Sequence, residues 1–419
     1  SPRKPNRLER LLPLVILALA GVLVAGSLSS CGQEGPQVPH RPGRLEGVPI
    51  IRVRLAGPVE GATLSTTGPY VLRVDARSVG QSRGRLAPVR VVREGDAWRF
   101  NNLHCSGIAA SLEPADDRSF VQFEGMSYRG SLRLVPAAGG GMLVINHLDM
   151  ESYLAGVLAR ELYPHWDLET YRALAVAART FALYHMKTVS PASPYDVGAG
   201  QAHQVYGGLA AETERAWAAV GSTHGRVLVH GPPEAEKIFM AQYSACNGGY
   251  VNGAWVIRPA QDIPPLAGGQ KDDDGRSCPR FLWGPVSIPK SDVHRALAAA
   301  YESAATLRGV HDIRVVEQTS YGRPVWLDVR DDLGHSVRIR AEDLRLAILR
   351  SDVPGGGRLY SMNCKIRVLP DAIEFYDGRG FGHGVGLSQW GAQDKASRGW
   401  NARQILEFYY PGASIVPAY

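Results

Sequence analysis

The hydrophobic pattern changes near Asp149, and this change limits the folds open to the chain. From Ile50 onward, short β-branched and aromatic runs such as IIRVRL, YVLRVDA and AWRFNNL alternate with glycine and polar turns, which is typical of antiparallel strands. After Asp149, apolar residues recur at helical spacing in MESYLAGVLARE and DLETYRALAVAARTFALYHMKT. A proline, Pro164, separates these two predicted helices. The sequence therefore predicts an α+β fold, with a β-rich N-terminal unit at 48–148 and a mixed α/β core of catalytic type at 149–419.

The length also predicts more than one packed unit. The chain has 419 residues, and a single hydrophobic core rarely extends that far. Residues 291–306 and 341–350 have helical patterns and flank strand-like runs at 310–340. We expect residues 288–350 or so to form a subdomain inserted into the core.

The first thirty residues have the pattern of an export signal. Their basic head precedes an uncharged, largely aliphatic stretch from Leu11 to Ser30. The run Leu-Ser-Ser-Cys that ends at Cys31 resembles the lipobox of bacterial lipoproteins. We expect residues 1–30 to be a lipoprotein signal peptide, Cys31 to be lipidated, and 31–47 to be a flexible tether. A plain signal peptide and an uncleaved membrane anchor are the alternatives.

The charge gives little support to a nucleic-acid partner. The net charge is +6, but the first ten residues alone hold four basic side chains and one acidic side chain. The rest of the chain therefore carries only +3, spread too thinly for a polyanion groove of the nucleic-acid type. An exported, lipid-anchored protein fits these observations better.

Four cysteines follow the predicted leader, at Cys105, Cys246, Cys278 and Cys364. An even number in an exported chain permits disulfides, with three possible sets of pairs. Because no Cys-x-x-Cys pair occurs, a four-cysteine structural zinc site is unsupported.

Two charged residues stand out among apolar neighbours. Arg179 is the only charge in the run 173–184, and a buried guanidinium needs a carboxylate partner or a wet cleft. Glu161 ends the preceding predicted helix beside apolar residues, where burial and the helix dipole raise a carboxyl pKa. A general acid needs such a raised pKa. A structural ion pair for Arg179 and a solvated Glu161 are the alternatives.

The segment GRGFGHGVG, residues 378–386, has glycine at every second position. An extended strand would then have one bare face, suited to close approach by another segment, with Arg379, Phe381 and His383 on the other. A phosphate-binding loop is excluded, because no Lys-Ser/Thr follows and no Rossmann unit surrounds it. Trp390 follows as a candidate sugar platform, while the acidic run 272–274 is expected to be a solvated loop.

Four segments resemble the stage II sporulation protein D and amidase-enhancer family of bacterial cell-wall proteins. They are YLAGVLARELYPHWDLETYRALAVAARTFAL, QVYGG, SACNGGY and GRGFGHGVGLSQWGAQDKASRGWNARQILEFYYPG. The enzymes of that family are lytic transglycosylases that act on glycan strands stripped of their stem peptides. The resemblance implies that Glu161 is the catalytic acid and that Arg179 belongs to the same site. It further suggests substrate-binding roles for Gln204, Tyr206, Tyr243, Ser244, His383, Gln389 and Trp390.

The resemblance also bears on the cysteines. Some relatives bind zinc with two cysteines and two histidines near the Cys-x-Gly-Gly segment, and Cys246 and Cys278 match those cysteines. Tyr243 and Phe281 stand near the places where histidines would be needed. A Cys246–Cys278 disulfide is therefore favoured over zinc, and neither a metal nor another cofactor is expected.

Three hypotheses for function remain. The favoured one is a lytic transglycosylase that cleaves between N-acetylmuramic acid and N-acetylglucosamine, with Glu161 as acid. The resemblance suggests that Arg179 binds the muramic lactyl carboxylate, which is free only where no stem peptide is attached to it. The second is a non-catalytic module that binds glycan strands and stimulates a cell-wall amidase, and the third is a lipid-anchored link between membrane and wall.

Overall fold

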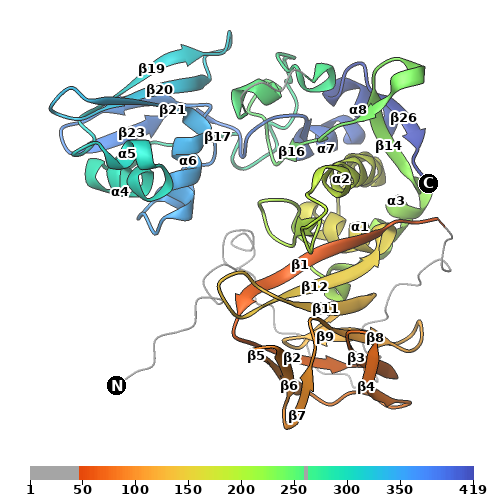
Figure 1. Cartoon of the computed structure of the whole chain (residues 1–419). Helices are drawn as coiled ribbons and strands as arrows, with labels where there is room; N and C mark the ends of the chain where they lie inside the picture. Colours follow the sequence, from red (N-terminus) through yellow and green to blue (C-terminus); the bar gives the residue numbers. More distant parts are fainter. Residues whose placement is uncertain (1–46, 259–262) are drawn as a thin grey trace, which may run out of the picture.

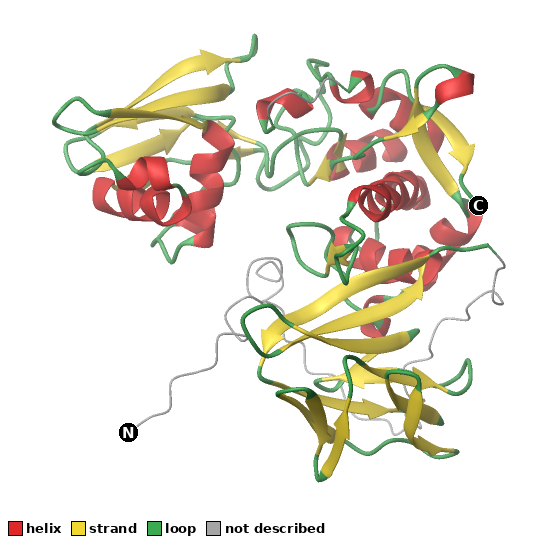
Figure 2. Ribbon diagram, viewed as in Figure 1, coloured by secondary structure: helices red, strands yellow, loops and turns green. Residues whose placement is uncertain are grey.

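The computed structural model describes residues 47–258 and 263–419. Strands gather at the N-terminal end and helices in the middle of the chain, as Figure 2 shows, so the protein has an α+β fold. The predicted leader, lipidation site Cys31 and tether lie outside the described residues. Within the described part, no helix is long and apolar enough to cross a membrane.

Two antiparallel sheets dominate the N-terminal part (Figure 1). The larger sheet has the order β13 (Val197–Gly198), β1 (Ile50–Val59), β12 (Met142–Asp149), β11 (Ser131–Pro136), β8 (Ala110–Pro114), β3 (Tyr70–Val74) and β4 (Arg77–Ser82), with β13 joining in parallel. The second has the order β10 (Met126–Tyr128), β9 (Val121–Phe123), β2 (Gly61–Thr66), β5 (Val89–Glu94), β6 (Ala97–Phe100) and β7 (Leu103–Ser106). The predicted antiparallel strands are confirmed, and β11 and β12 form a hairpin.

Five helices form the core, and the first two of them contact the larger sheet. They are α1 (Met150–Glu161), α2 (Leu168–Thr188), α3 (Glu214–Ser222), α7 (Gln389–Ser397) and α8 (Ala402–Tyr409). Short strand pairs join them: β15 (Lys237–Ile238) and β26 (Ser414–Pro417) flank β14 (Arg226–His230), β16 (Tyr243–Ser244) pairs with β25 (Leu387–Ser388), and β17 (Leu282–Trp283) pairs with β24 (Gly378–Arg379). One apolar cluster extends from Ile51 to Tyr410, so these helices share a core with the strands.

Local sequence signals explain where the core helices begin. The Asp149 side chain caps α1 by accepting from Ser152 N–H, and Asn401 with Gln404 forms the predicted capping box of α8. Asp167 occupies the N-cap position of α2 but its side chain makes no capping bond. It accepts from Gln393 in α7 instead, so this side chain links α2 to α7 rather than capping α2.

A second apolar cluster lies within residues 286–375. Its strands are β18 (Val286–Pro289), β23 (Ala372–Tyr376) and β22 (Lys365–Val368), and β19 (Asp312–Gln318), β20 (Pro324–Arg330) and β21 (Ser336–Arg340). Its helices are α4 (Lys290–Ala300), α5 (Glu302–Ala305) and α6 (Ala341–Arg350). The cluster extends beyond residue 350, the predicted end of the subdomain, because β23 pairs with β18. This long-range contact is not revealed by the local sequence pattern.

Short 3-10 turns complete the description: Leu209–Ala211, Pro233–Ala235, Ala254–Val256, Pro264–Leu266 and Gly356–Arg358.

Candidate active site

Glu161 is the last residue of α1 and is half-buried. The helix ends there because Leu162 turns to an extended conformation ahead of Pro164. Its carboxylate is held from two distant segments: Val205 N–H donates to Oε1 at 3.1 Å, and Gln389 Nε2 donates to Oε2 at 2.9 Å. Both carboxylate oxygens are therefore fixed in direction.

Burial raises the pKa of Glu161 above its ordinary value, and the hydrogen bonds from Val205 and Gln389 oppose that shift. The net effect is a raised pKa, so the Glu161 carboxyl keeps its proton to a higher pH than a glutamic acid in water would. A partly accessible carboxyl that retains its proton and has a fixed orientation can donate a proton to a bound substrate.

A chain of polar side chains passes beside this carboxyl. Tyr153 OH donates to Gln204 Oε1 at 3.1 Å, and Gln204 Nε2 donates to Tyr243 OH at 3.0 Å. Burial, and then the charge of Glu161, raise the pKa of both tyrosines, so both remain neutral phenols. Tyr243 is half-buried, and its hydroxyl oxygen accepts the hydrogen bond from Gln204. The hydroxyl proton of Tyr243 is therefore available to an acceptor near Glu161.

Four of the predicted substrate-binding side chains are buried, and one of them, Gln389, binds the Glu161 carboxylate. Gln204 is in the chain just described, Tyr206 OH donates to Asn146 Oδ1 at 3.0 Å within the core, and Ser244 Oγ accepts from Gly384 N–H at 3.1 Å. Direct contact of Gln204, Tyr206 and Ser244 with a substrate is therefore a wrong prediction. Their apolar surroundings come from strands remote in sequence, which the motif alone does not reveal.

The glycine segment is not the extended strand that its alternation predicts. Gly380, Gly382, Gly384 and Gly386 all have positive φ, between 66° and 96°. The close approach is confirmed: a Cβ on Gly386 would meet Gln242 O at 2.0 Å. His383 Nδ1 accepts from Val385 N–H at 3.0 Å, and burial lowers the pKa of His383 to about 4, so the imidazole is neutral.

Trp390 packs in an aromatic group beside Gln389. Its ring lies 4.8 Å from that of Trp166 and 5.5 Å from that of Tyr163, measured between centroids. Trp390 is half-buried, whereas Tyr163 is 44% exposed. Tyr163 and Trp390 thus offer an apolar surface next to the carboxyl, and Tyr163 is a residue that motif reasoning missed.

Arg179 does not lie beside Glu161. Its side chain is fully buried, and Nε and Nη2 donate to the two oxygens of Glu151 at 2.9 and 2.6 Å. Nη1 donates to the carbonyl of Arg226 at 3.0 Å. Glu151 is in the first turn of α1 and Glu161 in the last, about 15 Å along the helix axis. The predicted cleft position of Arg179 is wrong, and the alternative of a structural ion pair is correct.

Comparison with known proteins agrees with this arrangement. A family described as "SpoIID: Stage II sporulation protein" matches residues 138–230, which include Glu161. An uncharacterized protein of Brachyspira hyodysenteriae is 30% identical over 88% of this chain and 93% of its own length. The chain belongs to the stage II sporulation protein D and amidase-enhancer (SpoIID/LytB) family.

Named relatives are more distant. The amidase enhancer of Bacillus subtilis is 25% identical over 62% of this chain and 40% of its own length. The stage II sporulation protein D of the same organism is 26% identical over 65% of this chain and 76% of its own length. Both names place this SpoIID/LytB chain among cell-wall-related proteins.

In this SpoIID/LytB protein, Cys246 and Cys278 pack together as free thiols, and the Cys246 thiol donates to the Gly275 carbonyl at 3.7 Å. The disulfide is not formed in this structure and stays a prediction. Phe281 joins the same apolar cluster. Among the described residues, no three His, Cys, Asp or Glu side chains gather as metal ligands do.

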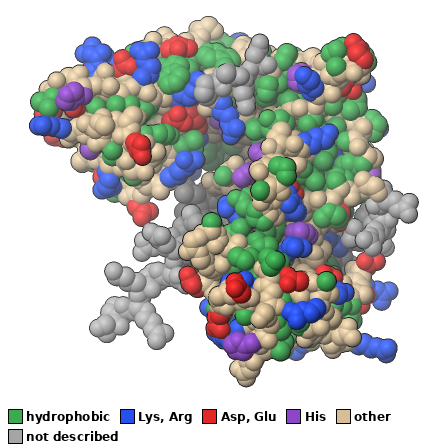
Figure 3. Space-filling model, viewed as in Figure 1, with side chains coloured by type: hydrophobic (Ala, Val, Ile, Leu, Met, Phe, Trp, Pro, Cys, Tyr) green, Lys and Arg blue, Asp and Glu red, His purple; other side chains and the backbone are tan. Residues whose placement is uncertain are grey.

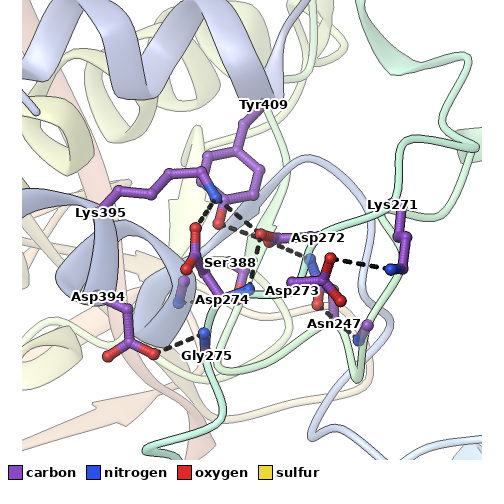
Figure 4. Close-up of polar contacts among 12 residues, drawn as sticks. Asn247, Lys271, Asp272, Asp273, Asp274, Gly275, Ser388, Asp394, Lys395 and Tyr409 are labelled. Atoms are coloured by element: carbon purple, nitrogen blue, oxygen red, sulfur yellow. Dashed lines mark hydrogen bonds and ion pairs between the residues drawn. The ribbon is translucent and has the colours of Figure 1, made fainter. Parts of the chain in front are cut away.

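The acidic run is solvated only in part (Figure 4): Asp272 is buried, Asp274 is half-buried and Asp273 is exposed. Asp272 is 0% exposed; Lys395 Nζ donates to its Oδ1 at 2.7 Å, and Tyr409 OH donates to its Oδ2 at 2.7 Å. Asn247 Nδ2 also donates to Oδ2, and Lys395 bonds Asp274 at 2.5 Å. The predicted solvated loop is therefore wrong for Asp272, whose buried carboxylate is neutralised by a lysine more than a hundred residues later, and correct for the exposed Asp273. The cluster fixes α7, which begins at Gln389, beside the segment that contains Asn247.

Proposed function

We propose that this protein is a lytic transglycosylase-like enzyme that cleaves peptidoglycan strands stripped of stem peptides, between N-acetylmuramic acid and N-acetylglucosamine. The observation that supports the proposal best is Glu161: one half-buried carboxyl with a raised pKa and two fixed oxygens. A carboxyl of this kind is suited to protonate a glycosidic oxygen.

The proposed reaction needs one acid and no water. Glu161 donates its proton to the bridging oxygen, and the bond from that oxygen to muramic C1 breaks. The muramic C6 hydroxyl attacks C1, gives its proton to the Glu161 carboxylate, and leaves a 1,6-anhydro end. Hydrolytic glycosidases need a second carboxylate, but the groups that act on the Glu161 pKa are amide donors and not a second acid.

The neighbours of Glu161 would orient it and the sugar. Gln389 and the Val205 amide fix the carboxyl plane, and they stabilise the carboxylate that forms when the proton leaves. The neutral Tyr243 hydroxyl is available as a donor to substrate, and the Tyr163 and Trp390 rings offer a sugar-stacking surface.

The experiment is digestion of purified stripped glycan by wild type and by Glu161→Gln. The amide keeps the shape of the side chain but has no acidic proton, so turnover should fall at least about 100-fold. Glu407→Gln is the matched control, because Glu407 is an exposed carboxylate on α8, and this variant should keep full activity. Full activity in Glu161→Gln would end the proposal.

A second candidate is a non-catalytic enhancer of a cell-wall amidase, which the similarity to the amidase enhancer favours. It predicts that stripped glycan is bound but not cut, and that a partner amidase works faster in its presence. In either case we propose an exported protein that is held to a membrane through Cys31 and faces the wall.

A further inference from the structure

One face of the seven-stranded sheet carries a row of arginines. In register, Arg54 on β1 and Arg133 on β11 both pair with Ile145 on the strand between them. Directly paired residues project to the same side of an antiparallel sheet, so Arg54 and Arg133 share a face, two strands or about 10 Å apart. Arg52 lies two residues before Arg54 on the same face and pairs with His147.

Of these three arginines, only Arg52 forms an ion pair with a carboxylate in the described part of the chain, although Arg133 lies close enough to Asp75 to lower the pKa of that carboxyl. Arg52 is neutralised by buried Asp196 at 2.6 Å. Arg54 donates to Tyr195 OH at 2.9 Å and lies over that ring. Within residues 47–258 and 263–419, neither Arg54 nor Arg133 has a carboxylate partner. Repulsion between such positive charges destabilises the folded state. Their presence on one face therefore points to a binding partner of opposite charge.

The charged face continues through a pair of histidines. A Cβ on Gly198 would lie 3.5 Å from His203 Nδ1 and 3.7 Å from Arg54 Nη2, so these two groups are neighbours. The His203 and His185 rings are 5.0 Å apart, and His185 Nε2 is buried with no hydrogen-bond partner in the described part of the chain. Burial lowers the pKa of both imidazoles, helped by His203 and Arg258 for His185, whose pKa falls to about 4, and by Arg54 and Arg258 for His203, so both are neutral donors.

The end of this charged face that carries His203 and His185 lies near the Glu161 site. His203 precedes Gln204 and is two residues before Val205, whose N–H binds the carboxylate. His185 packs on Phe181, which contacts Tyr243. On the face of the molecule in Figure 3, blue and purple side chains recur around the central hollow. We call Arg133, Arg54, His203, His185 and Arg258 the cationic stripe.

We propose that the cationic stripe binds the lactyl carboxylates of a peptide-stripped glycan strand. The inference rests on the proposed function and deepens it, because it assigns to the stripe the carboxylate recognition that the sequence suggested for Arg179. A stripped strand has one free carboxylate on every muramic residue, and spaced arginines fit a repeated anion better than a single one. On a strand that keeps its peptides, each of these carboxylates is an amide without charge.

The test measures binding and not cleavage. In a Glu161→Gln background, the affinity for stripped glycan is compared with that for the same glycan after its carboxylates are converted to amides. The parent should prefer the charged strand. The double change Arg54→Gln/Arg133→Gln should weaken binding of that strand by about tenfold and leave the amide strand unaffected. Arg314→Gln on β19, an exposed arginine of the other apolar cluster, is the control.

Unchanged affinity in the double variant, or an equal loss for charged and amide strands, would overturn the inference. Tighter binding of a glycerol-phosphate polymer than of stripped glycan would do the same, because the stripe would then be a phosphate site. Failure of catalysis is a separate result: a wild type that does not cleave stripped glycan, but binds it through the stripe, contradicts the proposed function and supports this inference.

Discussion

Burial of Glu161 links its chemistry to the stability of the fold. Its pKa is raised in the folded protein, so its contribution to stability is fully present below the unfolded pKa of about 4.3 and is lost as pH rises through the folded value. Glu161→Gln removes the ionisable group. Chemical denaturation should therefore find this variant more stable than wild type at pH 7, with a difference that disappears near pH 4. A variant less stable than wild type at pH 7 would mean that the carboxylate is not strained there.

Gln389 should set the pH range of activity. Its amide hydrogen bond to Oε2 lowers the pKa of Glu161, so Gln389→Leu should raise that pKa further. The alkaline limb of the kcat/KM profile would then move to higher pH, while the maximal rate falls because the carboxyl is less well oriented. Gln404→Leu, which removes the capping box of α8, should leave the pH limb in place; an equal shift in both variants would refute a direct role.

Arg179 should matter for folding rather than for substrate. It is fully buried with Glu151, and removal of one partner of a buried pair costs about 3–5 kcal/mol. Glu151→Gln and Arg179→Met should both lower the free energy of unfolding by that amount. KM for stripped glycan, measured at a temperature where the variants stay folded, should not change. A raised KM without loss of stability would restore Arg179 to the substrate site.

The contrast between these residues shows how far sequence reasoning extends. The position of Glu161 at a helix end is predictable, because the helical period and Pro164 are local. The need of Arg179 for a partner is predictable too, but the choice of Glu151 depends on how α1 packs against α2. The pairing of Asp272 with Lys395 likewise depends on contacts between segments far apart in the chain.

At the scale of elements, the start of α7 depends on the buried Asp272–Lys395 pair. Lys395→Met would leave Asp272 buried without its cation and should cost about 3–5 kcal/mol of stability. Arg398→Met removes an exposed partner of Asp274 and should cost less than about 1 kcal/mol. Thermal and urea unfolding of the two variants tests this. Similar losses in both would show that the buried pair carries no special weight.

Most of the regular elements were predictable from the sequence, since strands and helices follow local hydrophobic period. The glycine segment was not, because alternation of glycine is compatible both with a bare strand and with a series of left-handed turns. Its approach to Gln242 and Asn252 selects the turns, and those contacts are known only from the folded chain.

At the scale of the whole molecule, the predicted leader would hold the protein at a membrane. The first described strand begins at Ile50, 19 residues after Cys31, so a lipid on that cysteine would hold the site within reach of the wall. Cys31→Ala should move the protein from the membrane fraction to the soluble fraction. Unchanged membrane retention would indicate an uncleaved anchor instead.

We propose that the Glu161 site, the cationic stripe and the aromatic surface act together. A single acid would then cut a charged, peptide-free strand without water. The most direct test is digestion of stripped glycan in water labelled with ¹⁸O, followed by mass analysis of the new ends. We expect 1,6-anhydro muramic ends that contain no label, formed by wild type alone and not by Glu161→Gln. Reducing ends that carry ¹⁸O, or no cleavage unless an amidase is added, would contradict it.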